Sequence, residues 1–195
     1  EAVYRVPYLA HAAMEPMNCT VHFHDGACEV WTGTQDNLGI RGRVASIAGL
    51  DEDAVTLHAF YLGGGFGRRL PTSTNTIDQA TLIAQQFDVP VQTLWSREED
   101  MRQDYYRPAV SSHFRAAFDS ARKLIAWENT YIGKNEPAEA AHSPYDIPNK
   151  SIAWVDSPTH VPFGAWRSVA HSQHTFFMES FVYELAHQSG KNTNQ

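Results

Sequence analysis

The chain has 195 residues, of which 43% are hydrophobic and 19% charged, a composition typical of a globular protein with a core of its own. Its formal net charge is −7, and no basic cluster is denser than Arg41 with Arg43 or Arg68 with Arg69, which argues against a nucleic-acid-binding face. No apolar run approaches the roughly 20 residues of a membrane-spanning helix, and the opening sequence EAVYR is not typical of a signal peptide.

A β-hairpin is the first predicted element. Asp25 and Gly26 separate two alternating segments and place its strands at residues 18–24 and 27–32. In that register Phe23 pairs with Cys28, and Cys19 lies on the order of 13 Å further along the same face. A disulfide requires Cα atoms within about 7 Å. We therefore expect both cysteines to be buried and reduced.

A helix, a strand and a glycine-rich loop follow. Asp36 is the expected N-cap of the helix, and Gly49 ends it. A β-type run at residues 54–61 leads directly into the glycine loop, which we define as residues 63–67.

Two further helices are expected around a short strand at residues 89–95. Thr76 with Gln79 has the spacing of a capping box for the first helix. Ser96 with Glu99 has the same spacing for the second.

Strands dominate the next part of the chain, at residues 110–118 and 124–132, followed by a loop at 133–148. The last helix is expected at about residues 168–188, ended by Gly190, and residues 191–195 look frayed. One face of this helix would carry Phe176, Phe177, Ser180, Phe181 and Leu185.

This order of elements predicts an α+β fold in which mixed α/β sheets are packed with helices. We expect two closely packed subdomains. Residues 1–98 would form an α/β subdomain with the hairpin, Gln35 and the glycine loop. Residues 99–195 would form an α+β subdomain with a β-hairpin and the long C-terminal helix.

The glycine loop is the sharpest chemical feature. Glycines permit positive φ angles and a close approach of backbone to a ligand, and exposed N–H groups favour an anionic or polar one. Arg68 stands where a dinucleotide fingerprint needs its third glycine, and the Gly-Lys-Ser/Thr ending of a phosphate-binding P-loop is missing. We expect Gly65 and Gly67 to adopt unusual conformations and Phe66 to enter a pocket. A tight turn with close packing explains a generic glycine run equally well.

Other polar groups are weaker candidates. His22 and His24 alternate on one strand face without a convincing third ligand, which favours a solvated pair over a metal site. His171 and His174 on the last helix are better explained by packing or capping. The acidic residues 98–100 suit the positive end of a helix dipole.

Three motifs follow one another along the chain: TQ at 34–35, GGGFGRR at 63–69 and LWSREEDM at 94–101. They stand in the order found in the xanthine oxidase and aldehyde oxidoreductase superfamily of molybdenum hydroxylases, which the chain resembles over nearly its whole length. Three others resemble the isoquinoline 1-oxidoreductase β-subunit in particular: YLAHAAMEP at 8–16, YDIPN at 145–149, and GAWRSV at 164–169 with Ser172-Gln173.

The resemblance implies that the chain is the first molybdopterin-binding domain of such an enzyme. The cofactor-binding residues it implies are Gln35, Gly64, Gly65, Phe66, Gly67 and Arg167. The Gln35 amide would lie beside the molybdenum or the pterin, donating and accepting without adding charge. The Arg167 guanidinium could hold an oxyanion or phosphate oxygen in fixed geometry.

The implied activity belongs to a larger assembly that hydroxylates N-heteroaromatic compounds or aldehydes with oxygen from water. Its cofactor would be a molybdopterin cytosine dinucleotide carrying molybdenum. The resemblance also implies a separate small subunit that carries two [2Fe–2S] clusters and removes the electrons. The two cysteines here lack cluster spacing, so this chain is not expected to hold those clusters itself. Both that subunit and a second cofactor-binding domain are the expected partners, with self-association through the open cofactor face.

Departures from the family pattern limit this implication. The family's general-base glutamate belongs to the second cofactor domain, so we assign no catalytic residue and no metal ligand here. Leu70 stands where some relatives carry an acidic residue. The chain resembles a fragment that is inactive alone. The alternative is a non-catalytic binding module, and a weaker alternative is an unrelated nucleotide-binding α/β domain. The sequence does not distinguish between the bacterial cytoplasm and the periplasm as the compartment.

Overall fold

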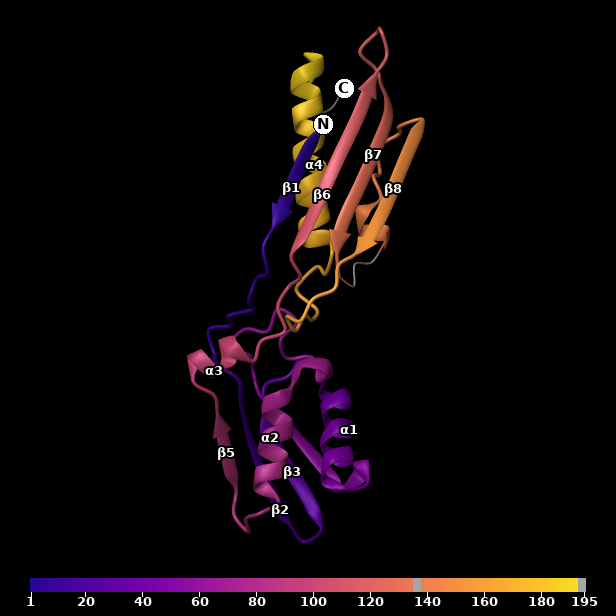
Figure 1. Cartoon of the computed structure of the whole chain (residues 1–195). Helices are drawn as coiled ribbons and strands as arrows, with labels where there is room; N and C mark the ends of the chain where they lie inside the picture. The colour runs from indigo at the N-terminus through magenta and orange to yellow at the C-terminus, as the bar shows by residue number, and fades with distance from the viewer. Residues whose placement is uncertain (135–137, 193–195) are drawn as a thin grey trace. The chain divides into compact units, whose positions relative to one another are not determined.

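The computed structural model describes residues 1–134 and 138–192, which form two compact units. Unit 1 comprises Glu1–Leu9, Pro108–Val161 and Arg167–Gln195, and unit 2 comprises Ala10–Arg107 and Pro162–Trp166. The division is therefore discontinuous in sequence and is not a single cut after residue 98. Figure 1 shows the elements of each unit.

Unit 2 is a four-stranded mixed sheet with helices against one face (Figure 1). Its strand order is β4-β3-β2-β5, with β2 (Asn18–His24), β3 (Ala27–Thr32), β4 (Val55–Ala59) and β5 (Val91–Leu94). The strand β2 pairs antiparallel with both β3 and β5, whereas β3 and β4 run parallel. Between β3 and β4 lies helix α1 (Asn37–Ala48), the crossover that a parallel pair requires.

The core of unit 2 lies between this sheet and the helices α1 and α2 (Asn75–Ala84). Side chains from alternate sheet positions meet apolar helix side chains, and the buried set is Cys19, Val21, Cys28, Val30, Ile40, Val44, Ala45, Val55, Ile77, Ala80 and Ala84. Alternation in a strand sends every second side chain to the same face. The opposite face of the sheet is therefore the polar one.

Unit 1 is a second mixed sheet, of order β1-β6-β7-β8, packed with one long helix (Figure 1). Its strands are β1 (Ala2–Val6), β6 (Val110–Phe118), β7 (Leu124–Gly133) and β8 (Asn149–Asp156), and its helix is α4 (His171–Ser189). The core contains Val110, Phe114, Trp127, Ile147, Phe177, Phe181 and Leu185.

Short elements complete the chain. They are α3 (Arg97–Arg102) and the 3-10 helices η1 (Glu52–Ala54), η2 (Pro71–Ser73) and η3 (Ala138–Ala141). The expected α+β fold, with mixed sheets packed by helices, is confirmed.

Many local predictions are confirmed. The hairpin has its expected strands, and Phe23 pairs with Cys28. Asp36 caps α1 by accepting from the Gly39 N–H at 2.9 Å, and Gly49 ends that helix with φ +70°. Ser96 caps α3 by accepting from the Glu99 N–H at 3.2 Å. Both cysteines are buried and free.

The predicted capping box of α2 is wrong. Thr76 is fully buried inside the helix, which begins at Asn75 after the 3-10 turn η2. The Gln79 Oε1 atom instead accepts a hydrogen bond from the Trp95 indole at 3.0 Å. The tertiary contacts of Thr76 and Gln79 thus override the capping preference of the local sequence.

Unit 1 also differs from the predictions. The strands β1 and β8 are not among the expected elements, and η3 lies within the predicted loop, where residues 135–137 lie outside the described part. Helix α4 begins only at His171, because Ser168 and Val169 have positive φ angles. Phe176 is exposed, not part of the buried face. Of the tail expected to fray, residues 193–195 are likewise not described.

Candidate functional site

The glycine loop follows β4 and has the strained backbone that its sequence suggests. Gly64 and Gly67 have φ angles of +108° and +110°, and Phe66 has +59°. The expectation of an unusual conformation is confirmed for Gly67 but is wrong for Gly65, whose φ is not positive. A Cβ at Gly65 would lie 2.6 Å from the Gln35 Oε1 atom. A side chain at position 65 would therefore require the Gln35 amide to shift from the loop.

Gln35 holds the loop through its amide oxygen. That oxygen accepts from the Gly67 N–H at 2.9 Å and from the Arg69 N–H at 3.2 Å. The Gln35 backbone N–H in turn donates to the Arg69 carbonyl at 3.0 Å. The side chain is exposed, and within the described part of the chain its Nε2 donates to no protein group. The amide nitrogen of this exposed residue is thus available to a ligand.

The Arg69 side chain forms hydrogen bonds with three segments of unit 2, at Gly64, Gly33 and Glu15. Its side chain is only 1% exposed. Nε donates to the Gly64 carbonyl at 3.0 Å, Nη1 to the Gly33 carbonyl at 3.3 Å, and Nη2 to Glu15 Oε2 at 2.9 Å. A guanidinium with its donors directed at several backbone carbonyls makes the loop a rigid part of unit 2.

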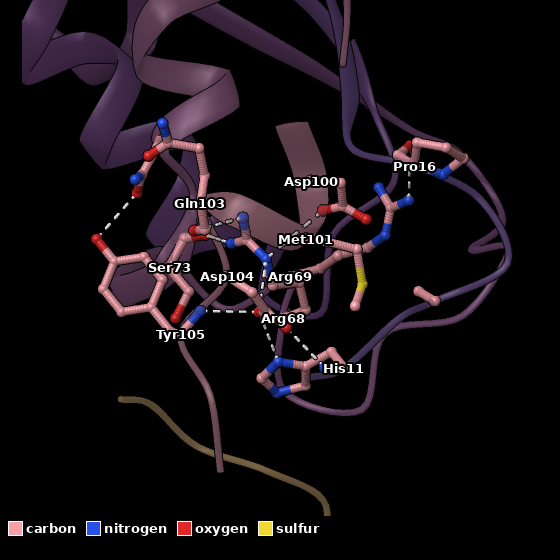
Figure 2. Close-up of polar contacts among 12 residues, drawn as sticks. His11, Pro16, Arg68, Arg69, Ser73, Asp100, Met101, Gln103, Asp104 and Tyr105 are labelled. Atoms are coloured by element: carbon pink, nitrogen blue, oxygen red, sulfur yellow. Dashed lines mark hydrogen bonds and ion pairs between the residues drawn. The ribbon is translucent and has the colours of Figure 1, made fainter. Parts of the chain in front are cut away.

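Arg68 occupies a second buried position, between two carboxylates (Figure 2). Its Nε lies 3.1 Å from Asp104 Oδ1 and 3.8 Å from Asp100 Oδ1. The remaining nitrogens donate to the carbonyls of Ser73 and Gln103. The rings of Trp95 and Tyr105 each lie 5.7 Å from its guanidinium carbon, so the charge is also covered by aromatic faces.

His11 extends this buried ion-pair network toward the segment Pro162–Trp166. Its backbone N–H donates to Asp104 Oδ2 at 2.6 Å, and its Nδ1 lies 2.8 Å from Asp104 Oδ1 (Figure 2). Its Nε2 lies 2.9 Å from the Ala165 carbonyl oxygen. The same oxygen would lie 1.8 Å from a Cβ at Gly67, so this carbonyl packs directly against the loop.

Two aromatic rings lie beside the loop. Phe66 and Trp166 are stacked with ring centroids 6.4 Å apart and planes inclined by 19°. Phe66 is 41% exposed, so the expectation that its side chain enters a pocket is wrong. The Trp166 Nε1 is buried and has no hydrogen-bond acceptor among the described residues. A buried indole N–H without an acceptor is a donor that a ligand could use.

The two acidic neighbours of Arg68 have opposite pKa shifts. Burial raises the pKa of Asp104, but hydrogen bonds from His11 and the charges of His11 and Arg68 together lower it below the ordinary value. Burial also raises the pKa of Asp100, and here the attraction of Arg68 and Arg97 does not reverse the rise. Burial lowers the pKa of both Arg68 and Arg69.

The structure places the expected cofactor-binding residues in two groups. Gln35, Gly64, Gly65, Phe66 and Gly67 lie together in unit 2, joined by the contacts above. Arg167 is exposed and belongs to unit 1. Its convergence with the other residues stays a prediction.

Sequence reasoning missed the residues that support the loop. In the sequence, Arg68 and Arg69 form a basic cluster at the end of the GGGFGRR motif, and the acidic run at 98–100 is interpreted as helix-dipole partners within LWSREEDM. Neither interpretation predicts buried ion pairs. Asp104 and His11 have no functional interpretation at that level, although they form the buried network with Arg68. One feature of the sequence could have indicated this network, namely two consecutive arginines directly after the glycine loop. Arginine is rarely buried unless it is paired, so arginines packed against such a loop would require acidic partners.

The comparisons with known proteins agree with one another. The molybdopterin cofactor-binding domain family matches the chain over residues 1–195. This chain belongs to that family. It is 27% identical to the β-subunit of isoquinoline 1-oxidoreductase from Brevundimonas diminuta, over 95% of this chain and 25% of that protein.

Solved structures show the same fold. Quinoline 2-oxidoreductase from Pseudomonas putida 86 superposes with a TM-score of 0.79 at 20% identity, over 98% of this chain and 27% of that one. Aldehyde oxidoreductase from Desulfovibrio gigas gives 0.76 at 21% identity, over 98% of this chain and 22% of that one. The chain thus spans about a quarter of the length of these relatives. No helix in the described residues is long and apolar enough to cross a membrane.

The residues at the glycine loop fit a molybdenum cofactor, a large, polar and anionic group. Glycines allow its close approach, the Gln35 amide offers a donor, and Phe66 offers a half-exposed ring. Their rigidity comes from Arg69 below the loop and from Ala165 packed against it. A preformed, stiff wall of this kind lowers the entropic cost of holding a ligand.

Proposed function

We propose that this chain forms one wall of the molybdenum-cofactor site of an oxidoreductase that hydroxylates N-heteroaromatic compounds or aldehydes with oxygen from water. The observation that carries the proposal is the double hydrogen bond from the Gly67 and Arg69 N–H groups to the Gln35 amide oxygen. It leaves the amide nitrogen of this exposed residue without a protein hydrogen bond among the described residues, beside a loop of glycines. Family membership over the whole chain supplies the identity of the ligand.

Each residue has a distinct role in this proposal. Gln35 donates from Nε2 to a polar atom of the cofactor. The backbone of Gly64, Gly65 and Gly67 permits its close approach, and Phe66 supplies an apolar wall. Arg167, which follows Trp166 directly in sequence, holds an oxyanion or phosphate oxygen through its guanidinium. The cofactor itself supplies the redox chemistry when bound, and the protein positions and polarises.

The finer parts of the proposal concern the larger assembly. The cofactor would be the cytosine dinucleotide form of molybdopterin. A small subunit with two [2Fe–2S] clusters would remove electrons, and a second cofactor-binding domain would contribute the general-base glutamate. Support comes from relatives that are named as subunits of larger enzymes, among them those of isoquinoline 1-oxidoreductase and nicotinate dehydrogenase.

The variant Gln35→Glu tests the role of the amide nitrogen. It keeps an oxygen that accepts from Gly67 and Arg69 but replaces the nitrogen donor with a second acceptor. We expect molybdenum and pterin retained by protein purified from cofactor-producing bacteria to fall about tenfold, the effect of losing about 1.4 kcal/mol. Gln92→Glu, on the exposed side of β5, is the matched control.

Arg167 requires a separate variant because it belongs to unit 1. Arg167→Gln should also lower cofactor retention, whereas Arg115→Gln, an exposed arginine of the same unit, should not. Wild-type retention in both Gln35→Glu and Arg167→Gln would contradict the proposal. So would equal losses in the two control variants.

A further inference from the structure

The polar face of the unit 2 sheet gathers imidazoles and a carboxylate. His22 and His24 lie on β2, and Glu29 lies on β3 directly opposite His22 in the antiparallel register. Glu29 also has a neighbour from β4, since His58 Nε2 lies 3.5 Å from its Oε1 atom. These residues are on the face that α1 and α2 do not cover, because the buried positions alternate with them.

Three of these side chains already stand at near-chelating distances. One ligand atom from each of His22, His24 and Glu29 lies within 4.8 Å of the other two. His24 Nε2 is 3.8 Å from Glu29 Oε2. In a tetrahedral site with bonds of about 2.1 Å, ligand atoms are separated by about 3.4 Å. Closing that difference would require these partly exposed side chains to rotate toward one another.

His58 provides the second, independent observation. Its ring stacks on Trp31 with centroids 4.9 Å apart and planes inclined by 9°, which fixes the imidazole in place. Its Nε2 is buried and makes no hydrogen bond within the described residues, although it faces Glu29. Carboxylates that bind metals are commonly oriented by such an outer partner. Here that partner is already held in position.

We propose that His22, His24 and Glu29 bind a divalent transition-metal ion of the zinc class, with His58 as a positioning residue that orients Glu29. Two imidazoles and one carboxylate suit zinc, whereas magnesium and calcium require more oxygen ligands. Three protein ligands leave a fourth position for water or for a group from a partner molecule. None of these residues belongs to the glycine loop, so this site is independent of the function proposed above.

The test is calorimetric titration of zinc chloride into purified protein that carries no histidine tag. We expect one ion per chain and no heat from magnesium chloride. His24→Ala and Glu29→Gln should each weaken zinc binding at least tenfold, as expected for the loss of a ligand. His113→Ala is the control, because His113 is a half-exposed histidine of unit 1 that pairs with Glu1.

His58→Ala separates positioning from ligation. It should weaken zinc binding about tenfold, the lower end of the range for outer-shell partners, and should leave the visible spectrum of bound cobalt(II) tetrahedral. Zinc affinity that is unchanged in both His24→Ala and Glu29→Gln, with circular dichroism showing folded protein, would overturn the site. An unchanged affinity in His58→Ala would overturn its positioning role.

Discussion

Buried charge is the most consequential feature at the scale of single residues. Arg68 and Asp104 are each 2% exposed, and their ion pair is supplemented by His11 and by two backbone carbonyls. A buried charge that loses its partner keeps the cost of its desolvation. The network that supports the glycine loop is therefore vulnerable to the loss of one carboxylate.

Asp104→Asn tests this vulnerability. The variant keeps the size of the side chain and leaves Asp100 as the one remaining ion-pair partner of Arg68 among the described residues. We expect the free energy of unfolding to fall by about 3 kcal/mol, the lower end of the range for breaking a buried pair. Urea denaturation measures this value. Asp88→Asn, at an exposed aspartate, should change stability by less than about 0.5 kcal/mol.

The pH dependence of the same variant has a defined sign. Because the folded-state pKa of Asp104 is lowered, its contribution is fully present above the unfolded pKa of about 3.9 and is lost as pH falls through the folded value. The stability difference between wild type and Asp104→Asn should therefore narrow below about pH 4. Asp100, whose folded pKa is raised, has the opposite sign: its ionisation destabilises the fold as pH rises from the unfolded pKa of about 3.9 towards the higher folded value. A difference that widens toward acid would contradict the assignment.

Gly67 shows a second requirement at the residue scale. A Cβ there would overlap the Ala165 carbonyl at 1.8 Å, in addition to the cost of a φ of +110°. Gly67→Ala should therefore destabilise the protein by about 2–4 kcal/mol, combining backbone strain with forced displacement. Gly26→Ala isolates the strain, because Gly26 has φ +77° but open space around its Cβ position. If the midpoint temperature of unfolding falls equally in both variants, the Ala165 carbonyl is displaced at little energetic cost.

At the scale of elements, the alternation of side chains along the strands gives the unit 2 sheet one apolar face and one polar face. Cys19, Val21, Cys28 and Val30 face α1 and α2, while the histidines and Glu29 face outward. A register slip of one residue would exchange the two sets. The Asp25-Gly26 turn holds the register that makes one face a core and the other a polar surface.

Cysteine reactivity reports whether this packing is intact. Burial raises the pKa of Cys19 to about 12 and that of Cys28 to about 11. Since only the thiolate is nucleophilic, neither should react with a disulfide reagent at pH 8 in the native protein. Both should react once the protein is unfolded in guanidinium chloride. Rapid labelling of either thiol under native conditions would show that α1 and α2 open readily from the sheet.

At the scale of the whole molecule, the chain crosses between its two units more than once. The N-terminal strand β1 pairs with β6, more than a hundred residues later, and the segment Pro162–Trp166 returns to pack against the glycine loop. Neither unit is therefore a continuous stretch of sequence. This organisation explains why residues of the candidate site are so widely separated along the chain.

The activity of the chain alone is a prediction at this scale. We expect purified chain of these 195 residues to fold but to show no hydroxylase turnover, because in the proposed assembly the general base and the electron relay would be supplied by other parts. The assay is dye-linked oxidation of isoquinoline or an aldehyde, with heat-killed protein as control. Turnover above that control would contradict the division of roles proposed here.

The sequence alone determined the features that depend on neighbouring residues. Caps at Asp36 and Ser96 and the turn at Asp25-Gly26 follow from short-range backbone hydrogen bonding and conformational preference. The family and its glycine loop were likewise readable, because ordered motifs do not require coordinates. Gln35 and the loop were predicted together from that resemblance, and the structure added the hydrogen bonds that join them.

Tertiary structure decided what depends on distant partners. Edge strand β8 has almost no buried side, so its residues carry no period of two that a pattern could reveal. The pairing of Arg68 with Asp104 and of His22 with Glu29 arises from chain path and strand register. A charged side chain looks the same in sequence whether it is solvated or buried. Only the packing decides whether the charge is solvated or buried, because the cost of desolvation depends on what surrounds the charge.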